Sequence, residues 1–143
     1  NHSELSDKMR DVLISNENGS IRMLMLKEIL EKHPDFSLAY YLIGRQLYFE
    51  KEYAHSIEYL SKAEDLRLSD ESLTYENYRL LGENYFHVGE YEKAISYFDN
   101  IVIPPAPFDK GGVNSERCIG EINRAKDWIE RCQWEWSNEV SKQ

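Results

Sequence analysis

The sequence predicts an all-α protein, an α-solenoid of antiparallel helix pairs, and three observations lead to this fold class. Apolar residues recur at three- and four-residue spacings, the period of amphipathic helices. Alternating apolar and polar runs, which are typical of strands, are nearly absent. Glycine and proline fall where the apolar period breaks, at Gly19, Pro34, Gly89, the Pro104-Pro105-Ala106-Pro107 run and Gly111-Gly112. With 143 residues, 41% of them hydrophobic, the chain can bury one core, so we expect a single domain over residues 1–143.

About seven helices are expected between these breaks. Ser20 is a good N-cap for the second helix. Pro34 ends that helix, because the residue ahead of a proline is pushed out of the helical region. The fifth helix is capped by Ser69 or Asp70 and reaches Val88. The other helices among the first six are predicted near residues 4–15, 20–32, 36–50, 53–67 and 90–102.

Residues 103–113 form a proline- and glycine-rich loop that cannot be helical. Proline stiffens its first half and glycine frees its second half, which leaves three roles open: a lid, a docking strand or a spacer. Asn114 or Ser115 then caps a long last helix over residues 114–138. One apolar stripe of this helix would lie on the preceding pair, and it consists of Cys118, Ile122, Ala125, Ile129, Cys132 and Trp136.

An internal repeat with an offset of 38 residues relates the third and fourth helices to the fifth and sixth. Aligning Gly44 on Gly82 superimposes Tyr40 on Tyr78, Ile43 on Leu81, Leu47 on Tyr85, Tyr53 on Tyr91, Ser56 on Ala94, Leu60 on Phe98 and Ala63 on Ile101. Two helix pairs therefore follow one template. The two glycines remove a side chain where paired helices cross, and Ser56 and Ala94 are expected to be the small residues that face them.

The repeat resembles the tetratricopeptide repeat (TPR) family. The match over residues 75–108 is carried by Tyr78, Leu81, Gly82, Tyr85, Gly89, Tyr91, Ala94, Phe98 and Pro105. A second copy matches over residues 37–70, and residues 4–35 resemble a degenerate first repeat that ends at Pro34. With 71–105 as the third repeat and 114–138 as a capping helix, the resemblance implies a right-handed superhelix that needs about three stacked pairs for stability.

The same resemblance selects a candidate partner-binding groove, because the first helix of each TPR pair lines the concave face. The residues that would project into it are Leu38, Tyr41, Arg45, Tyr48 and Phe49 from one repeat and Glu76, Arg79, Glu83, Phe86 and His87 from the next. Aromatic residues and arginine suit an extended or helical peptide. The alternative is that Tyr48, Phe49 and Phe86 only pack between repeats. The carboxylate clamp of chaperone-binding TPR domains is not supported, and Arg45 and Arg79 are the candidates if a carboxylate binds.

A possible second interface is formed by Phe108 in the loop and by Trp128 and Trp134, which lie off the main stripe of the last helix. Exposed indoles often mark an interface. Such an interface would make a homo-oligomer possible. A broad packed face of the last helix explains the tryptophans equally well.

Charge and composition exclude several partners. The formal net charge of −9 opposes phosphate backbones and anionic lipid surfaces, so we expect neither nucleic acid nor a membrane as partner. Cys118 and Cys132 would lie about 21 Å apart on one helix, too far for a disulfide, which favours a reducing, cytoplasmic compartment.

No cofactor, metal or catalytic motif is present, and the four histidines are isolated from the cysteines and from one another. We therefore expect no catalysis and no cofactor, but an adaptor or scaffold that binds a protein or peptide partner. Two alternatives stay open. The absence of an initiator Met allows an excised or processed piece, a regulatory or substrate-presenting module of a larger enzyme. The tryptophans of the last helix allow a self-association module.

Overall fold

The computed structural model describes residues 2–14, 19–102 and 116–142, and these residues form seven helices and no strand. The all-α prediction is confirmed. The helices are α1 (His2–Ile14), α2 (Gly19–Lys32), α3 (Ser37–Phe49), α4 (Tyr53–Leu66), α5 (Glu71–His87), α6 (Tyr91–Val102) and α7 (Glu116–Ser141). The loop 103–113 and Phe108 lie outside the described residues. None of the described helices combines the length and the apolar character needed to cross a membrane.

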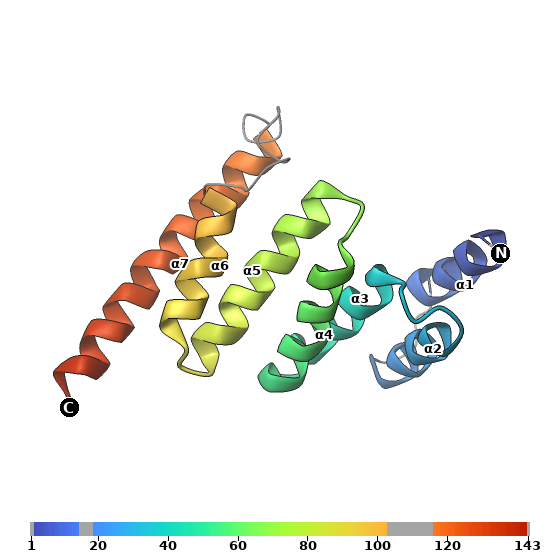
Figure 1. The fold of residues 1–143 in the computed structure, drawn as a ribbon, viewed down its shortest axis with the longest axis horizontal. Helices are drawn as coiled ribbons and strands as arrows, with labels where there is room; N and C mark the ends of the chain where they lie inside the picture. Colours follow the sequence, from blue (N-terminus) through green and yellow to red (C-terminus); the bar gives the residue numbers. More distant parts are fainter. Residues whose placement is uncertain (1, 15–18, 103–115, 143) are drawn as a thin grey trace.

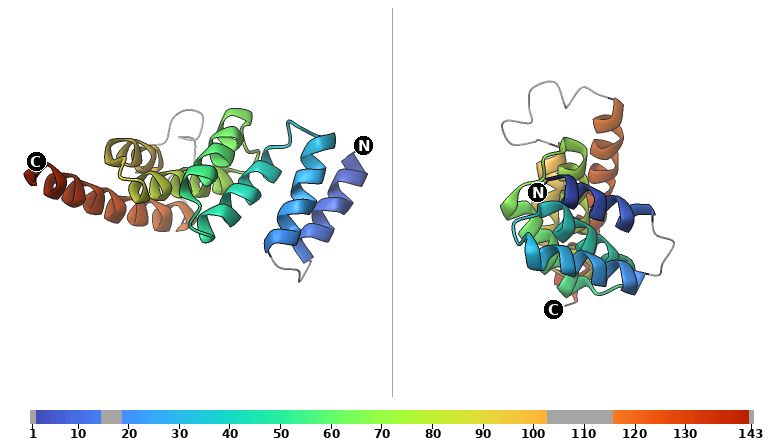
Figure 2. Two further views of the ribbon diagram at one scale, coloured as in Figure 1. Left: turned by 90° about the horizontal axis from the view of Figure 1, so that it is seen from below. Right: turned by 90° about the vertical axis from the view of Figure 1, so that its right-hand side faces the viewer.

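The helices follow one another in a row, with the two termini at opposite ends (Figure 1). Each helix packs against the next one in sequence, and two further contacts join α3 to α5 and α5 to α7. The left-hand view of Figure 2 shows the α1–α2 pair at one end of the row and α7 at the other. The helices α3, α5 and α7 therefore form an inner row. Their partners α4 and α6 are linked by a long side chain, since the Tyr97 hydroxyl donates to Glu64 at 2.9 Å.

Helix ends follow the predicted capping chemistry at one site and depart from it at another. Asp70 caps α5, and its carboxylate accepts hydrogen bonds from the backbone N–H groups of Ser72 and Leu73. Ser20 is not an N-cap as predicted, because α2 already begins at Gly19. The side chain of Gln46 lies against Gly19, where a Cβ would approach its amide nitrogen to 2.2 Å.

The turns after α3 and α5 have the same backbone structure, 38 residues apart. Lys51 and Gly89 both take a left-handed conformation, with φ of 64° and 82°. In each turn this residue and the next one donate back to the helix that the chain has just left, as in a Schellman motif. The bonds run from Lys51 N to Tyr48 O, Glu52 N to Leu47 O, Gly89 N to Phe86 O and Glu90 N to Tyr85 O, at 2.8 to 3.0 Å.

The crossings within the two pairs are also equivalent. A Cβ on Gly44 would lie 2.5 Å from the side chain of Leu60, and one on Gly82 would lie 2.6 Å from the ring of Phe98. Ser56 lies against Gly44 as predicted, since its hydroxyl bonds the Gly44 carbonyl. The space that a Cβ would fill at the two glycines is taken by Leu60 and Phe98, one turn later. Aligned residues thus make aligned contacts, and the sequence repeat is a structural repeat.

Ser56 has a separate role at the first crossing. Its hydroxyl donates to Gly44 O at 2.6 Å and accepts from the amide of Asn84 at 2.9 Å. All three groups are buried. This short chain of hydrogen bonds joins α3, α4 and α5, and it satisfies polar groups that would otherwise be costly to bury.

The hydrophobic core is divided along the row into clusters that each join neighbouring helices. The cluster at the N-terminal end contains Met9, Val12, Leu26, Ile29, Ala39 and Ile43. The middle cluster contains Tyr41, Leu60, Ala63, Leu80 and Leu81. The cluster at the C-terminal end contains Tyr75, Phe86, Ala94, Phe98, Ile101, Ala125 and Cys132. Each cluster needs two or more helices to close it, as in a stacked repeat.

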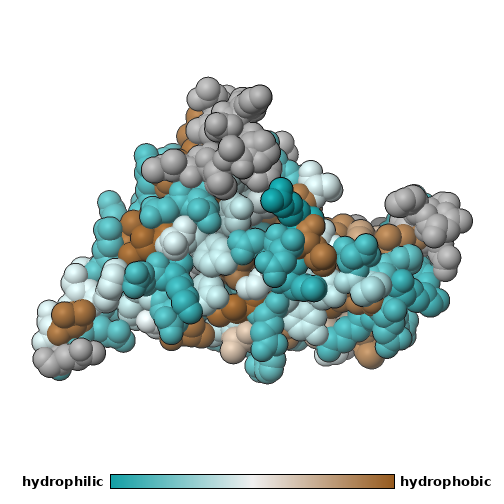
Figure 3. All heavy atoms as spheres, viewed as in Figure 1, coloured by the Kyte–Doolittle hydropathy of each residue, from teal (hydrophilic) through white to brown (hydrophobic). Residues whose placement is uncertain are grey.

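The last helix, α7, packs on α6 through part of the predicted stripe. Ala125 and Cys132 are fully buried, whereas Trp136 is 41% exposed. The C-terminal part of α7 runs on past the N-terminal end of α6 (Figure 1). The side chain of Cys118 is not described. On the face shown in Figure 3, apolar patches are small and separated by hydrophilic side chains.

Candidate functional site

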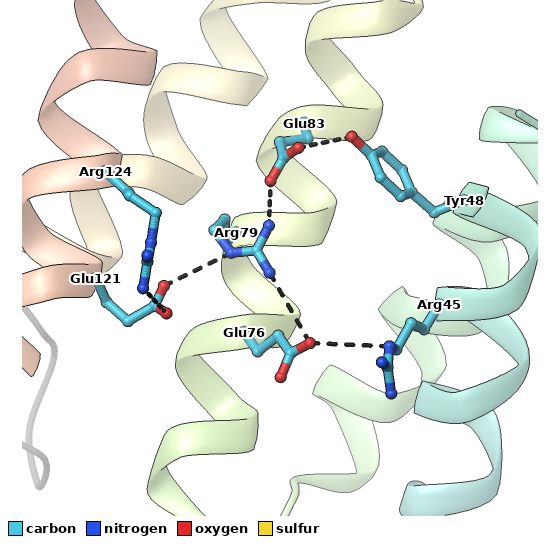
Figure 4. A network of polar contacts seen from close by, with 7 residues as sticks. All are labelled: Arg45, Tyr48, Glu76, Arg79, Glu83, Glu121 and Arg124. Carbon is cyan, nitrogen blue, oxygen red and sulfur yellow. Dashed lines mark hydrogen bonds and ion pairs between the residues drawn. The ribbon is translucent and has the colours of Figure 1, made fainter. Parts of the chain in front are cut away.

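The inner row of helices carries a network of charged side chains centred on Arg79 of α5 (Figure 4). Its guanidinium forms ion pairs with Glu76 at 3.8 Å and with Glu121 of α7 at 3.6 Å. It also donates a short hydrogen bond to Glu83, one turn further along α5. Three carboxylates therefore surround one arginine whose side chain is only 23% exposed.

Residues from the neighbouring helices complete the network. The Tyr48 hydroxyl of α3 donates to Glu83 Oε1 at 2.6 Å, and Arg45 Nε lies 4.0 Å from Glu76. On α7, Arg124 donates to Glu121 at 2.9 Å. The network thus contains three arginines and three glutamates, so its formal charges balance.

Burial makes this network structural. Glu83 is 6% exposed, and a buried carboxylate is strongly unfavourable unless it is paired and hydrogen-bonded. Arg79 and Tyr48 supply that pairing. Burial by itself lowers the pKa of Arg79, but the carboxylates of Glu83, Glu121 and Glu76 outweigh burial and raise it. Burial and the hydrogen bond to Glu83 both raise the pKa of Tyr48, so its hydroxyl remains a donor.

The predicted groove residues divide by exposure. Tyr41, Glu83 and Phe86 are buried and cannot line an accessible groove, which corrects the prediction for these three. Tyr41 is packed in the middle core cluster, and burial raises the pKa of its hydroxyl. The half-buried residues are Leu38, Tyr48, Glu76 and Arg79, and the exposed ones are Arg45, Phe49 and His87.

The aromatic residues of the groove differ in the same way. Phe86 packs edge-on against Trp128 and Tyr91, with ring centroids 5.3 and 5.6 Å apart. The packing alternative is therefore confirmed for Phe86. Phe49, in contrast, is 61% exposed at the end of α3. The guanidinium of Arg45 lies over its ring, 5.6 Å from the centroid.

His87 occupies the end of α5, the position equivalent to Phe49. Its ring stacks on Tyr53 with centroids 4.4 Å apart and an interplanar angle of 12°. Partial burial lowers the pKa of His87, and the positive charges of Arg131 and Lys51 lower it further, against the opposite effect of Glu83. The neutral imidazole is therefore the favoured form in the folded protein.

A cavity of about 260 Å³ lies beside the network, where α3 meets α1 and α2. Sequence reasoning placed Arg45 and Phe49 in the groove but did not connect them with α2, because the residues before Pro34 match the repeat pattern only weakly. Arg22, Met23 and Leu26 recur at the spacing of one helix face, the signal that could have found this wall. The described lining residues are Val12, Arg22, Met23, Leu26, Leu42, Arg45, Gln46 and Phe49.

The possible second interface is only partly accessible. Trp128 packs on Phe86 and stacks on Phe98 with centroids 5.7 Å apart, so the packed-face alternative holds for this residue. Trp134 is 64% exposed. Trp128 and Trp134 therefore belong to different surfaces of α7.

Among the described side chains, neither a group of metal ligands nor an exposed thiol is found. Within residues 2–14, 19–102 and 116–142, no three His, Cys, Asp or Glu side chains are placed to hold a metal ion. Cys132 is buried, and burial raises the pKa of its thiol to about 11, so the unreactive protonated form dominates at neutral pH.

Comparison with known proteins gives no further assignment. No family model matches the chain, and no curated protein matches it. The candidate site is therefore defined by its geometry: a closed ionic network on the inner row and, beside it, an open cavity with Arg45 and Phe49 at the boundary.

Proposed function

We propose that this protein is a protein-interaction module, an adaptor or scaffold of the tetratricopeptide repeat type that binds a segment of a partner and carries out no reaction itself. The repeated glycine crossing and the repeated Schellman turn support this proposal, because they build the stacked pairs on which such modules depend. A buried free thiol fits a reducing compartment such as the cytoplasm.

The observation that carries the proposal is the exposure of Phe49. The ring of Phe49 is 61% exposed, so most of its apolar surface faces water instead of other side chains. It lies on the inner row, beside a cavity and under the guanidinium of Arg45. Aromatic residues and arginine are the side chains most enriched where binding energy concentrates. The other predicted groove residues of α3 and α5, apart from the exposed His87, are buried, half-buried or paired in the ionic network, so we expect binding to concentrate near Phe49.

Peptide selection tests the proposal and does not require the natural partner to be identified. A random-sequence peptide library is displayed on phage and selected on the immobilised chain, and the recovered peptides are then synthesised. Their affinity is measured by fluorescence anisotropy for the wild type, for Phe49→Ala and for Leu24→Ala. Leu24 is a matched control because it is 62% exposed on α2 and is not among the residues that line the cavity.

We expect Phe49→Ala to weaken peptide binding by about tenfold, the usual effect of losing one aromatic anchor. Leu24→Ala should leave the affinity unchanged. Recovery of no binding peptide, or equal affinity for all three proteins, would contradict the proposal.

Self-association is a second candidate function, favoured by the exposure of Trp134, Trp136 and Val140 near the C-terminal end of α7. Sedimentation equilibrium at several protein concentrations distinguishes the two functions. A dimer that Trp134→Ser converts to a monomer would support self-association. A monomer at every concentration would exclude it.

A further inference from the structure

The cavity between α2 and α3 has an apolar floor. Leu26 is buried, Met23 and Leu42 are half-buried, and Phe49 is exposed at the end of α3. These side chains meet around a volume of about 260 Å³, slightly below the range of cavities that hold drug-sized ligands. The space thus suits one or two apolar side chains of a partner, but not a whole helix or a large ligand.

The charge around this cavity is opposite to that of the molecule. The chain carries 26 acidic and 17 basic residues, yet the described residues lining the cavity include two arginines, Arg22 and Arg45, and no carboxylate. Two other cavities in the described part of the chain each contain three carboxylates in their lining. An acidic segment would therefore meet arginines at this cavity and carboxylates at the other two.

Arg45 differs from Arg79 in how fully it is neutralised. Arg79 is enclosed by three carboxylates, whereas the contact of Arg45 with Glu76 is the longest ion pair of the network at 4.0 Å. The side chain of Arg45 is 46% exposed, and ion pairs in such settings contribute little. A carboxylate that approached Arg45 in a bidentate manner would form a stronger contact than the one Glu76 makes.

We infer that this cavity binds an acidic amphipathic segment of a partner protein, in which an apolar side chain enters between Met23, Leu42 and Phe49 while a neighbouring Asp or Glu pairs with Arg22 and Arg45. The inference rests on the proposed function and names the chemistry of its partner. The hydrophobic contact supplies affinity and the two arginines supply selectivity.

The peptides recovered by phage selection give the first test. The net negative charge of the chain attracts basic peptides without specificity, so it opposes the selection of acidic peptides. We expect the recovered sequences to combine Asp or Glu with Leu, Ile, Met or Phe. Their affinity should fall as salt concentration rises, since exposed ion pairs are screened. Enrichment of basic or uncharged peptides would overturn the inference.

The position of the peptide is tested by NMR on the three methionines. The chain has three of them, and each is placed differently: Met23 lines this cavity, Met25 lines the neighbouring cavity between α1 and α2, and Met9 is buried. After labelling of methionine methyl groups with ¹³C, a recovered acidic peptide should shift the Met23 signal and leave the Met25 signal in place. A shift of Met25 alone, or of neither, would overturn the inference.

Charge-neutralising variants test the role of the arginines. Arg22→Gln and Arg45→Gln should each weaken an acidic peptide by about tenfold, as expected for the loss of a charge-assisted hydrogen bond. Arg10→Gln is the matched control, because Arg10 lies exposed on α1 and pairs only weakly with Asp7, at 3.8 Å. Circular dichroism confirms that each variant is folded. Equal affinity for all of these variants would overturn the inference.

The two proposals fail in different ways. If peptides bind and depend on Phe49 but show no acidic preference and no shift of Met23, the acidic-segment inference is wrong and the interaction module stands. If no peptide binds at all, both are wrong.

Discussion

The helix pairs α3–α4 and α5–α6 have the same backbone arrangement but different surface residues. Both have a glycine at the crossing, covered by Leu60 in one pair and by Phe98 in the other, and both end their first helix in the same Schellman turn. The positions that face the inner row nevertheless carry different chemistry. Leu38, Tyr41, Arg45 and Phe49 of α3 correspond to Glu76, Arg79, Glu83 and His87 of α5.

The difference follows from the neighbours of each pair. The inner helix α5 lies between α3 and α7, so Tyr48 on one side and Glu121 on the other complete its ionic network. The inner helix α3 has α5 on one side only, and a cavity opens towards α2 on the other. The repeat therefore sets the backbone, and the neighbouring helices determine whether a face is closed or open to a partner.

Substitution of the crossing glycines should break both pairs and has the largest expected effect. Gly82→Ala places a Cβ against the ring of Phe98, which is fully buried and stacked on Trp128. We expect the free energy of unfolding to fall by about 3 kcal/mol, with a similar loss for Gly44→Ala, because a packed core does not yield readily to an added methyl group. Urea denaturation followed by circular dichroism measures this.

Gly120→Ala in α7 is the control for these substitutions. Its Cβ would meet nothing closer than the flexible end of Arg124 at 3.7 Å, so we expect a gain of about 1 kcal/mol from helix propensity. A loss below about 1 kcal/mol in Gly82→Ala would show that the crossing is looser than described.

The second prediction separates the two arginines. Arg79→Met leaves Glu83 buried without its main partner and should lower the free energy of unfolding by about 3 kcal/mol. Arg45→Met removes an exposed, long ion pair and should cost less than about 1 kcal/mol. Thermal and urea unfolding of both variants give the comparison.

A double variant shows whether the buried charge is the cause. Arg79→Met with Glu83→Gln should recover part of the lost stability, since the uncompensated carboxylate is gone. Equal stability of Arg79→Met and Arg45→Met would refute the distinction between a closed face on α5 and an open face on α3. Charge reversal at Arg79 is for the same reason unsuitable as a test of partner binding, because it would also destabilise the fold.

The third prediction exchanges the residues of the two equivalent turns. Lys51 takes a positive φ that glycine adopts without strain, so Lys51→Gly should stabilise the protein by about 1 kcal/mol. Gly89→Lys should destabilise it by a similar amount, and steric clash plays no part because nothing lies within 4 Å of a Cβ at Gly89. Unfolding midpoints at constant m-value measure both changes. Effects of the same sign in the two variants would contradict the equivalence of the turns.

The smallest expected effect is a pH dependence that arises at His87, the position where α3 has Phe49. The pKa of His87 is lower in the folded state than its ordinary value of 6.5, so the unfolded chain binds the proton more readily. The contribution of His87 to stability is present above pH 6.5 and is lost as the pH falls below it.

His87→Phe, which copies the residue at the equivalent position of α3, removes this dependence. As the pH falls from about 7 to about 5, the free energy of unfolding of the wild type should decrease relative to that of His87→Phe. Urea unfolding at a series of pH values measures it. A constant difference across this range would show that the imidazole environment is not altered by folding.

Sequence reasoning predicted the parts of the fold that depend on local pattern. Helix periods, the capping aspartate at Asp70 and the 38-residue offset between Gly44 and Gly82 are all properties of short segments, and the structure agrees with them. The N-cap at Ser20 was missed because Gly19 begins the helix, close to Gln46 of the next helix.

The candidate site depended on contacts that no local pattern reveals. Glu121 pairs with Arg79 although the two residues are 42 positions apart, and only the docking of α7 on the inner row brings them together. Phe86 and Trp128 bury each other by the same docking. The exposed Phe49 was predicted in the groove, but the cavity beside it requires the packing of α1 and α2 on α3, which the repeat pattern does not specify.

The hydrogen-bonded chain from Asn84 through Ser56 to Gly44 means that the helix pairs α3–α4 and α5–α6 cannot exchange places in the row. The positions equivalent to Ser56 and Asn84 are Ala94 in the later pair and Gln46 in the earlier one, and alanine has no hydroxyl to relay a bond. A longer array made by duplicating α5–α6 would therefore leave the next Asn84 without its buried acceptor. The modules of this protein are not interchangeable units, and an engineer who wished to extend the row would have to restore serine at position 94.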